Sequence, residues 1–134
     1  MFKKFALPLF VSALLVVAAA VSINDWGLAH RISYIDKIYH FLGGALAAWL
    51  VDLYVGRGIS ANKLKRFLII VAGACFVGVA WEIVEWLSSA YAPRFSPFLA
   101  HYMGIGTLED TLGDLVIDSL GASLYGATRL SRGK

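Results

Sequence analysis

The sequence predicts an all-α membrane protein: a four-transmembrane-helix bundle with both termini in the cytoplasm. Of its 134 residues 59% are hydrophobic and only 16% are charged, and the mean hydropathy is +0.71. A soluble domain of this length is normally less apolar. The chain also contains four apolar segments, and a helix needs about 20 residues to cross the bilayer. We therefore expect one integral membrane domain, residues 1–134, with spans near 5–23, 34–54, 67–90 and 107–130.

The first segment, MFKKFALPLFVSALLVVAAAVS, has two interpretations. Its basic start, apolar centre and small residues are typical of a signal peptide. Its apolar run of about 19 residues is longer than a usual signal-peptide core, which favours a retained span. Cleavage of this segment would leave three spans.

The distribution of Lys and Arg predicts the orientation, because cytoplasmic loops carry an excess of both residues. Basic residues gather at the two termini and between the second and third spans: Lys3, Lys4, Arg57, Lys63, Lys65, Arg66, Arg129, Arg132 and Lys134. The other two connections contain Arg31, Lys37 and Arg94. Both termini should lie in the cytoplasm of a bacterium, with the protein in the inner (cytoplasmic) membrane and these two connections in the periplasm.

Each of the last three spans carries acidic or imidazole side chains on one face. They are Asp36 and His40, then Glu82 and Glu85, then Asp110, Asp114 and Asp118. At 1.5 Å of rise per residue, His40, Glu82 and Asp114 all lie roughly 9 to 12 Å below the periplasmic surface. This common depth predicts a site shared by three helices.

Energetics favour the same grouping. A charged acid facing lipid near the bilayer centre costs roughly 2.5 to 3.5 kcal/mol, so these acids should point into the protein. Grouped carboxylates repel one another in a poorly solvated site. Protons, a metal ion, or the basic residues Lys37, His40 and Arg94 would have to supply positive charge.

The order of four short motifs resembles a known family. The motifs are DKIYHF, WEIVEW, an arginine (Arg94) in the following loop, and DTLGDLVIDSLGA. Over residues 36–126 they resemble the VanZ-like small integral membrane proteins and the related YjdF-like (DUF2238-type) inner-membrane group. The resemblance marks Asp36, His40, Glu82, Glu85, Arg94, Asp114, Asp118 and Gly121. Glu85 and Asp118 fit the YjdF-like branch, since the VanZ branch more usually has an amide at each place. The resemblance implies no particular biochemical activity.

Several of these residues also have a purely structural interpretation. Asp36 and Lys37 can mark the membrane interface as an ion pair at a helix start. Glu82 and Glu85 can bind spans together through hydrogen bonds. Asp110 can cap its helix or interact with the helix dipole. Such roles are less common for acids as deep as Asp114 and Asp118, because deep acids on a spanning helix are usually functional.

Three functions are consistent with the pattern. In the first, the periplasm-facing acid/His/Arg pocket binds a cation and, through it, a polar or phosphorylated lipid or cell-envelope molecule. In the second, the protein is a metal-assisted phosphoester hydrolase in which His40, Glu82 and Asp114 hold the metal and Arg94 the phosphate. In the third, it is a proton-linked carrier or an assembly subunit of a membrane complex.

Cofactors and partners follow from the same residues. Carboxylates with one imidazole suit Mg, Mn, Zn or Fe, so the cofactor we consider is a divalent metal. Membrane lipid is the expected partner, and the net charge of +3, spread over short flanks, does not suggest nucleic acid. Small residues spaced four apart allow close helix packing and leave a homo-oligomer open. The sequence contains no Walker, zinc-protease or haem-attachment motif.

Overall fold

A computed structural model describes residues 3–28, 32, 34–55, 62–102 and 106–132, and the regular structure in these ranges is entirely helical. The elements are α1 (Lys3–Ala20), which continues into the π-helical turn η1 (Val21–Asp25), then α3 (Ile35–Val55), α4 (Lys63–Phe95), α5 (Pro97–Tyr102) and α6 (Leu108–Arg132). Arg31, Arg57 and Lys134, which contributed to the predicted orientation, lie outside the described residues.

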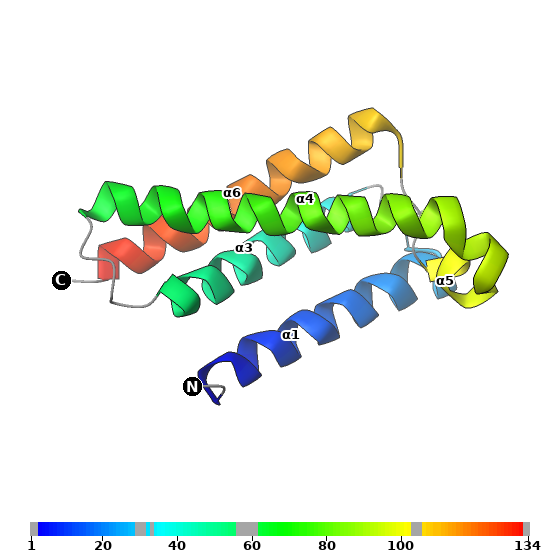
Figure 1. Cartoon of the computed structure of the whole chain (residues 1–134), viewed down its shortest axis with the longest axis horizontal. Coiled ribbons are helices and arrows are strands. Elements are labelled where there is room, and N and C mark those ends of the chain that lie inside the picture. Colours follow the sequence, from blue (N-terminus) through cyan, green and yellow to red (C-terminus); the bar gives the residue numbers. More distant parts are fainter. Residues whose placement is uncertain (1–2, 29–31, 33, 56–61, 103–105, 133–134) are drawn as a thin grey trace.

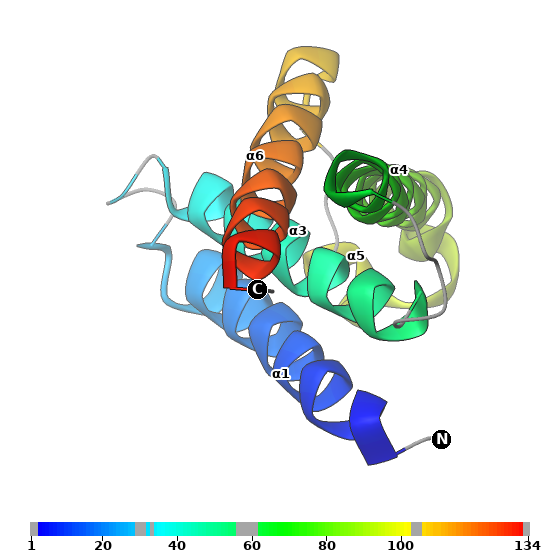
Figure 2. The same ribbon diagram turned by 90° about the vertical axis from the view of Figure 1, so that its left-hand side faces the viewer.

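Helix α3 lies at the centre of the bundle. It packs most extensively against α6, then against α4 and α1, and α4 also contacts α6 (Figures 1 and 2). Helix α1 packs on one side of α3, and the short α5 follows α4 at the opposite end from both chain termini (Figure 1). The N- and C-terminal ends of the chain thus lie at the same end of the bundle.

Local capping explains where two of the long helices begin. The Asn62 side chain accepts a hydrogen bond of 2.9 Å from the Lys65 backbone N–H at the start of α4. At the start of α6, Thr107 Oγ1 accepts a bond of 3.2 Å from the Asp110 backbone N–H. Thr107 therefore caps α6, and Asp110 lies in the first turn of this helix.

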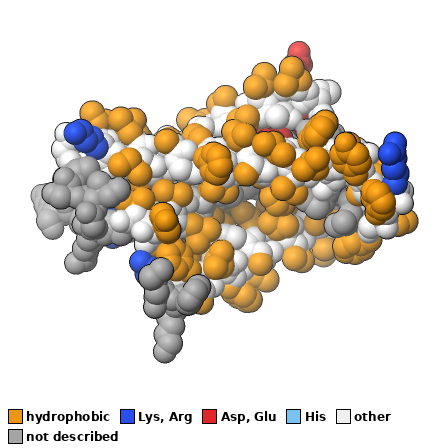
Figure 3. Space-filling view, in the orientation of Figure 1, with side chains coloured by type: hydrophobic (Ala, Val, Ile, Leu, Met, Phe, Trp, Pro, Cys, Tyr) orange, Lys and Arg blue, Asp and Glu red, His pale blue; other side chains and the backbone are white. Residues whose placement is uncertain are grey.

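Small side chains form the interior, and large apolar side chains cover the outside. The buried core consists of Ala47, Ala48, Ile70, Ala74 and Ala122, with Tyr125 packed against it. Leucine, valine and phenylalanine side chains are exposed along the helices, and hydrophobic atoms cover most of the face in Figure 3. A bilayer stabilises this arrangement, since helices in lipid associate through close packing of small residues. Among the residues that the structure describes, three helices are long and apolar enough to span a membrane: Lys4–Asp25, Ile35–Val55 and Lys63–Phe95.

Two glycines set the close approach of α3 and α6. A Cβ atom on Gly44 would collide with the backbone carbonyl of Asp118, and one on Gly121 would collide with that of Phe41. Both partners are backbone atoms, which cannot move aside without displacing a helix. This contact holds the acidic face of α6 against α3.

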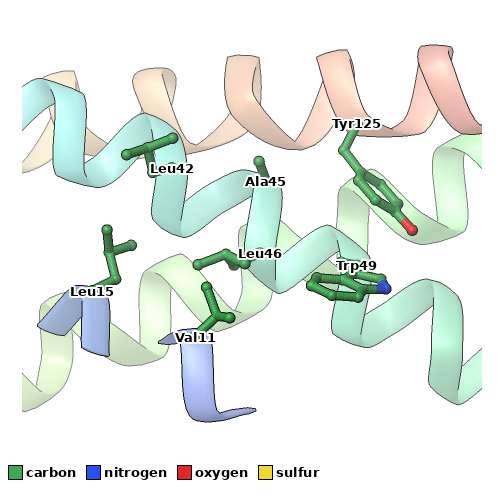
Figure 4. Close-up of a pocket in the computed structure, with 7 residues that line it drawn as sticks. All are labelled: Val11, Leu15, Leu42, Ala45, Leu46, Trp49 and Tyr125. Atoms are coloured by element: carbon green, nitrogen blue, oxygen red, sulfur yellow. The ribbon is translucent and has the colours of Figure 1, made fainter. Parts of the chain in front are cut away.

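An apolar groove lies between α1, α3 and α6. It has a volume of about 270 Å³ and is lined by Val11, Leu15, Leu42, Ala45, Leu46, Trp49 and Tyr125. Figure 4 shows these side chains on α1, α3 and α6. None of the predicted site residues lines this groove. The groove is therefore separate from the predicted polar site.

Candidate functional site

Lys37, in the first turns of α3, binds two acids of α6. Its Nζ atom lies 2.5 Å from Asp110 Oδ1 and 2.6 Å from Asp114 Oδ1. A third carboxylate, Asp36 Oδ2, is 3.7 Å away. Asp114 is buried, whereas Asp36 and Asp110 are about two-fifths exposed. Lys37 thus pairs with a partly exposed acid, Asp110, and with a buried one, Asp114.

His40 lies one turn deeper on α3, between three aspartates. Its Nε2 atom is 3.8 Å from Asp36 Oδ1 and 3.8 Å from Asp114 Oδ1. On the other side of the ring, Nδ1 lies 3.4 Å from Asp118 Oδ1. The Asp118 carboxylate occupies space that Gly78 of α4 leaves open, since a Cβ atom there would come within 2.7 Å of Asp118 Oδ2. Both ring nitrogens therefore face carboxylates.

Glu82 and Glu85 complete the group from α4. A carboxylate oxygen of each lies within 4.8 Å of the other and of a His40 ring nitrogen. Glu82 is only 6% exposed. Its buried Oε1 atom has no hydrogen-bond partner among the described residues. A buried acceptor without a donor is unfavourable by about 1 to 3 kcal/mol, and more when it is charged.

We call these residues the acid cluster: Asp36, Lys37, His40, Glu82, Glu85, Asp110, Asp114 and Asp118. It contains six carboxyl groups but only one lysine and one histidine to balance them. The cluster lies toward the end of the bundle opposite the chain termini, where α3 and α6 begin (Figure 1). Acidic groups therefore outnumber basic groups in the acid cluster.

Two sets of residues in the cluster have metal-ligating geometry. One is Asp36, His40 and Asp114, and the other is His40, Glu82 and Glu85; within each set the ligand atoms lie within 4.8 Å of one another. The sequence suggested His40, Glu82 and Asp114 as one metal set. The structure brings His40 close to both acids but places Glu82 and Asp114 in different sets.

Arg94 differs from the other predicted site residues. It lies exposed in the last turn of α4, nine residues and therefore about 14 Å beyond Glu85 along the helix. Within the described part of the chain, no ion pair joins Arg94 to an acid. Lys37, and not Arg94, forms the described ion pair with Asp110.

A second polar cluster, which the sequence interpretation missed, lies near the other end of α3. We call it the Asp52 cluster: Asp52, Arg66, Tyr125 and Arg129. The buried Asp52 carboxylate accepts from Arg66 at 2.6 Å, from Arg129 Nε at 3.1 Å and from the Tyr125 hydroxyl at 3.2 Å. The signal in the sequence was an acid inside the apolar run WLVDLYV, with basic residues at the starts and ends of neighbouring helices.

An all-helical bundle with apolar outer faces and an internal acid cluster defines a class of integral membrane protein. Comparison with known families agrees: the model of the predicted membrane protein family DUF2238 matches residues 2–132. The chain belongs to this family. No curated protein and no solved structure matches it significantly.

Proposed function

We propose that the protein binds a divalent cation in the acid cluster and, through that cation, a polar or phosphorylated lipid or cell-envelope molecule. The observation that carries the proposal is the buried, unpartnered Oε1 atom of Glu82 inside a cluster with an excess of acids. A buried carboxylate requires a counter-charge or a proton, because burial without one is strongly unfavourable. A bound cation would supply charge to several carboxylates at once.

The proposal includes a four-span topology with α6 as the fourth span. Apolar side chains spaced four apart, Leu112, Val116, Leu120 and Leu124, are each more than half exposed along one face of α6. Asp114 and Asp118 are buried on another face. Acids that point inward lower the average hydropathy of α6 without contacting lipid. At 25 residues, α6 is about 37 Å long, enough to cross the hydrocarbon.

The proposed location is the bacterial inner membrane with both termini in the cytoplasm. Four crossings would leave the two termini on the same side, which agrees with their position at one end of the bundle (Figure 1). Lys63, Lys65 and Arg66 begin α4 at that same end, as expected for the cytoplasmic side. The acid cluster would then face the periplasm. The resemblance to VanZ-like and YjdF-like proteins supports the same placement.

The lipid part of the proposal depends on the rim of the cluster. Asp36, Lys37 and Asp110 are partly exposed, and large apolar side chains surround them on the helix faces. A headgroup could therefore approach the cation while its acyl chains stay in the bilayer. Arg94, on the same side, has a guanidinium group well shaped to bind a phosphate.

Binding measurements on the detergent-purified protein test this function. We expect Mn²⁺ or Zn²⁺ to raise the thermal unfolding midpoint, and anionic phospholipid to bind more tightly when the metal is present than after chelation. Glu82→Gln should remove both effects, whereas Glu109→Gln, which removes an exposed acid outside the cluster, should retain them. The absence of any metal effect on the unmodified protein would contradict the proposal. If the protein hydrolyses a member of a phospholipid or polyprenyl-phosphate panel and the hydrolysis depends on Glu82, the protein is a phosphoester hydrolase and not only a binding protein.

A further inference from the structure

The two metal-ligating sets share His40 but differ in the positive charge already beside them. In the set formed by Asp36, His40 and Asp114, the Lys37 ammonium contacts Asp114 at 2.6 Å and Asp36 at 3.7 Å. A metal ion in this set would have to displace or closely approach that ammonium. Repulsion between two cations at such a distance is large in a site of low dielectric constant. Lys37 therefore acts as the counter-cation of this set.

The other set is not paired with a lysine or arginine of the described residues. Neither Glu82 nor Glu85 forms an ion pair with Lys or Arg within the described ranges of the chain, and Glu82 Oε1 is buried without a hydrogen-bond partner. Glu82 and Glu85 are three residues apart on α4, so both carboxyl groups emerge from the same face of the helix. The unmet requirement for positive charge is thus concentrated in this half of the cluster.

Asp118 adds a feature common around metal-binding histidines. A ligating imidazole usually donates its second ring N–H to a carboxylate, which fixes the tautomer and the ring orientation. Asp118 Oδ1, at 3.4 Å from His40 Nδ1, lies on the correct side of the ring for this role. If Nδ1 carries the proton toward Asp118, the lone pair of Nε2, which also lies 3.8 Å from Asp36 Oδ1 and from Asp114 Oδ1, remains for a metal.

We propose that His40, Glu82 and Glu85 bind one divalent transition-metal ion, with Asp118 as the positioning residue for His40 and Lys37 as a permanent counter-cation for Asp110 and Asp114. This inference rests on the proposed cation-binding function and assigns its ligands. One imidazole with two carboxylates suits Zn²⁺, Mn²⁺ or Fe²⁺. Ca²⁺ and Mg²⁺ prefer sites made of oxygen ligands alone, so they should bind more weakly.

Metal titration of matched variants tests the assignment. Zn²⁺ or Mn²⁺ alone is titrated calorimetrically into the purified, chelator-treated protein. We expect one ion per chain, with affinity reduced at least tenfold in His40→Ala, Glu82→Gln and Glu85→Gln. In the exposed control Glu109→Gln the affinity should remain within about threefold of the unmodified protein, and Asp114→Asn should reduce it less than Glu85→Gln does. With Mn²⁺, pulsed electron paramagnetic resonance should detect an imidazole nitrogen that is absent in His40→Ala.

Three results would overturn the assignment, and they have different consequences. Loss of metal in Asp114→Asn with retention in Glu85→Gln would move the ion to the other set and leave the proposed cation-binding function intact. Metal binding without an imidazole nitrogen signal would exclude His40 as a ligand but would leave Glu82 and Glu85 as ligands. Failure of the unmodified protein to bind either metal would overturn both proposals. Should Glu85→Gln not fold, Glu85→Asp replaces it, and it should bind the metal more weakly than the unmodified protein.

Discussion

The acid cluster and the Asp52 cluster lie between the same helices and both contain buried acids, yet their charges are balanced differently. In the Asp52 cluster a single carboxylate accepts from two arginines and a tyrosine. In the acid cluster six carboxyl groups surround one lysine and one histidine. Both His40 and Asp52 lie on α3, about 18 Å apart along the helix. Burial alone therefore does not distinguish a structural polar cluster from a candidate binding site.

The unpartnered buried atoms show the same difference. In the Asp52 cluster the unpartnered atom is Arg66 Nε, a donor on a group whose charge is already paired with Asp52. In the acid cluster it is Glu82 Oε1, an acceptor on a carboxyl group that forms no ion pair with a lysine or arginine among the described residues. Only the second requires additional positive charge. Charge balance, together with burial, therefore distinguishes the candidate site from the Asp52 cluster.

The largest effect on stability should come from the balanced cluster. Asp52→Asn leaves Arg66 and Arg129 without their carboxylate, and removing one partner of a buried ion pair lowers the free energy of unfolding by about 3 kcal/mol. Metal affinity should not change. Thermal unfolding and metal titration in detergent measure the two quantities separately. Tyr125→Phe, which removes one hydroxyl donor, should lower stability by only about 1 kcal/mol. Loss of metal in Asp52→Asn would show that the clusters act as one.

A smaller loss is expected at the helix contact between the two clusters. Gly44→Ala places a methyl group against the Asp118 backbone carbonyl, so α3 and α6 must separate, at a cost of about 2 kcal/mol. Gly43→Ala is the matched control, because a Cβ atom on Gly43 has nothing within 4 Å. Metal affinity should fall in Gly44→Ala alone, since Asp118 moves away from His40. Equal melting curves for the two variants would contradict this packing.

Lys37 gives a direct test of charge balance. Lys37→Met removes the cation beside Asp110 and Asp114, so the metal should bind about tenfold more tightly, which corresponds to about 1.4 kcal/mol. Lys37→Arg keeps the charge and should leave the affinity unchanged. Calorimetric titration with Zn²⁺ measures both. A weaker affinity in Lys37→Met would mean that Lys37 holds the acids in position for the metal.

The smallest effect on stability is expected at an exposed hydrogen bond outside both clusters. The Tyr102 hydroxyl donates to Asp25 Oδ1 and Oδ2, each at 3.0 Å, and this bond raises the pKa of Tyr102 above its usual value. The neutral phenol forms the bond, so its stabilising effect is present below about pH 10 and is lost as the pH rises through the raised pKa. Tyr102→Phe should change the melting midpoint slightly at neutral pH and not at all in strong alkali. Thermal unfolding across this pH range checks it, and a difference that grows with pH would contradict it.

The predictions from sequence were most accurate where the physics is local. Helical periodicity placed Asp36 beside His40 and Glu82 beside Glu85, and the structure has both pairs in close contact. Long-range partners were harder to predict. Arg94 and Lys37 were both available as counter-charges, and only the rotation and packing of the helices shows that Lys37 reaches Asp110 and Asp114.

The sequence by itself determined that this is a helical membrane protein with acids on the inner faces of its helices, because hydropathy and helical period are properties of single segments. The tertiary structure decided which acids lie beside Lys37 and which beside His40. The contacts of Gly44 and Gly121 bring α3 and α6 together. That close approach places Asp114 beside Lys37 and Asp118 beside His40. The same packing pairs Asp52 with Arg66 and Arg129. Such pairings depend on distances of a few ångströms between helices, which no single segment specifies.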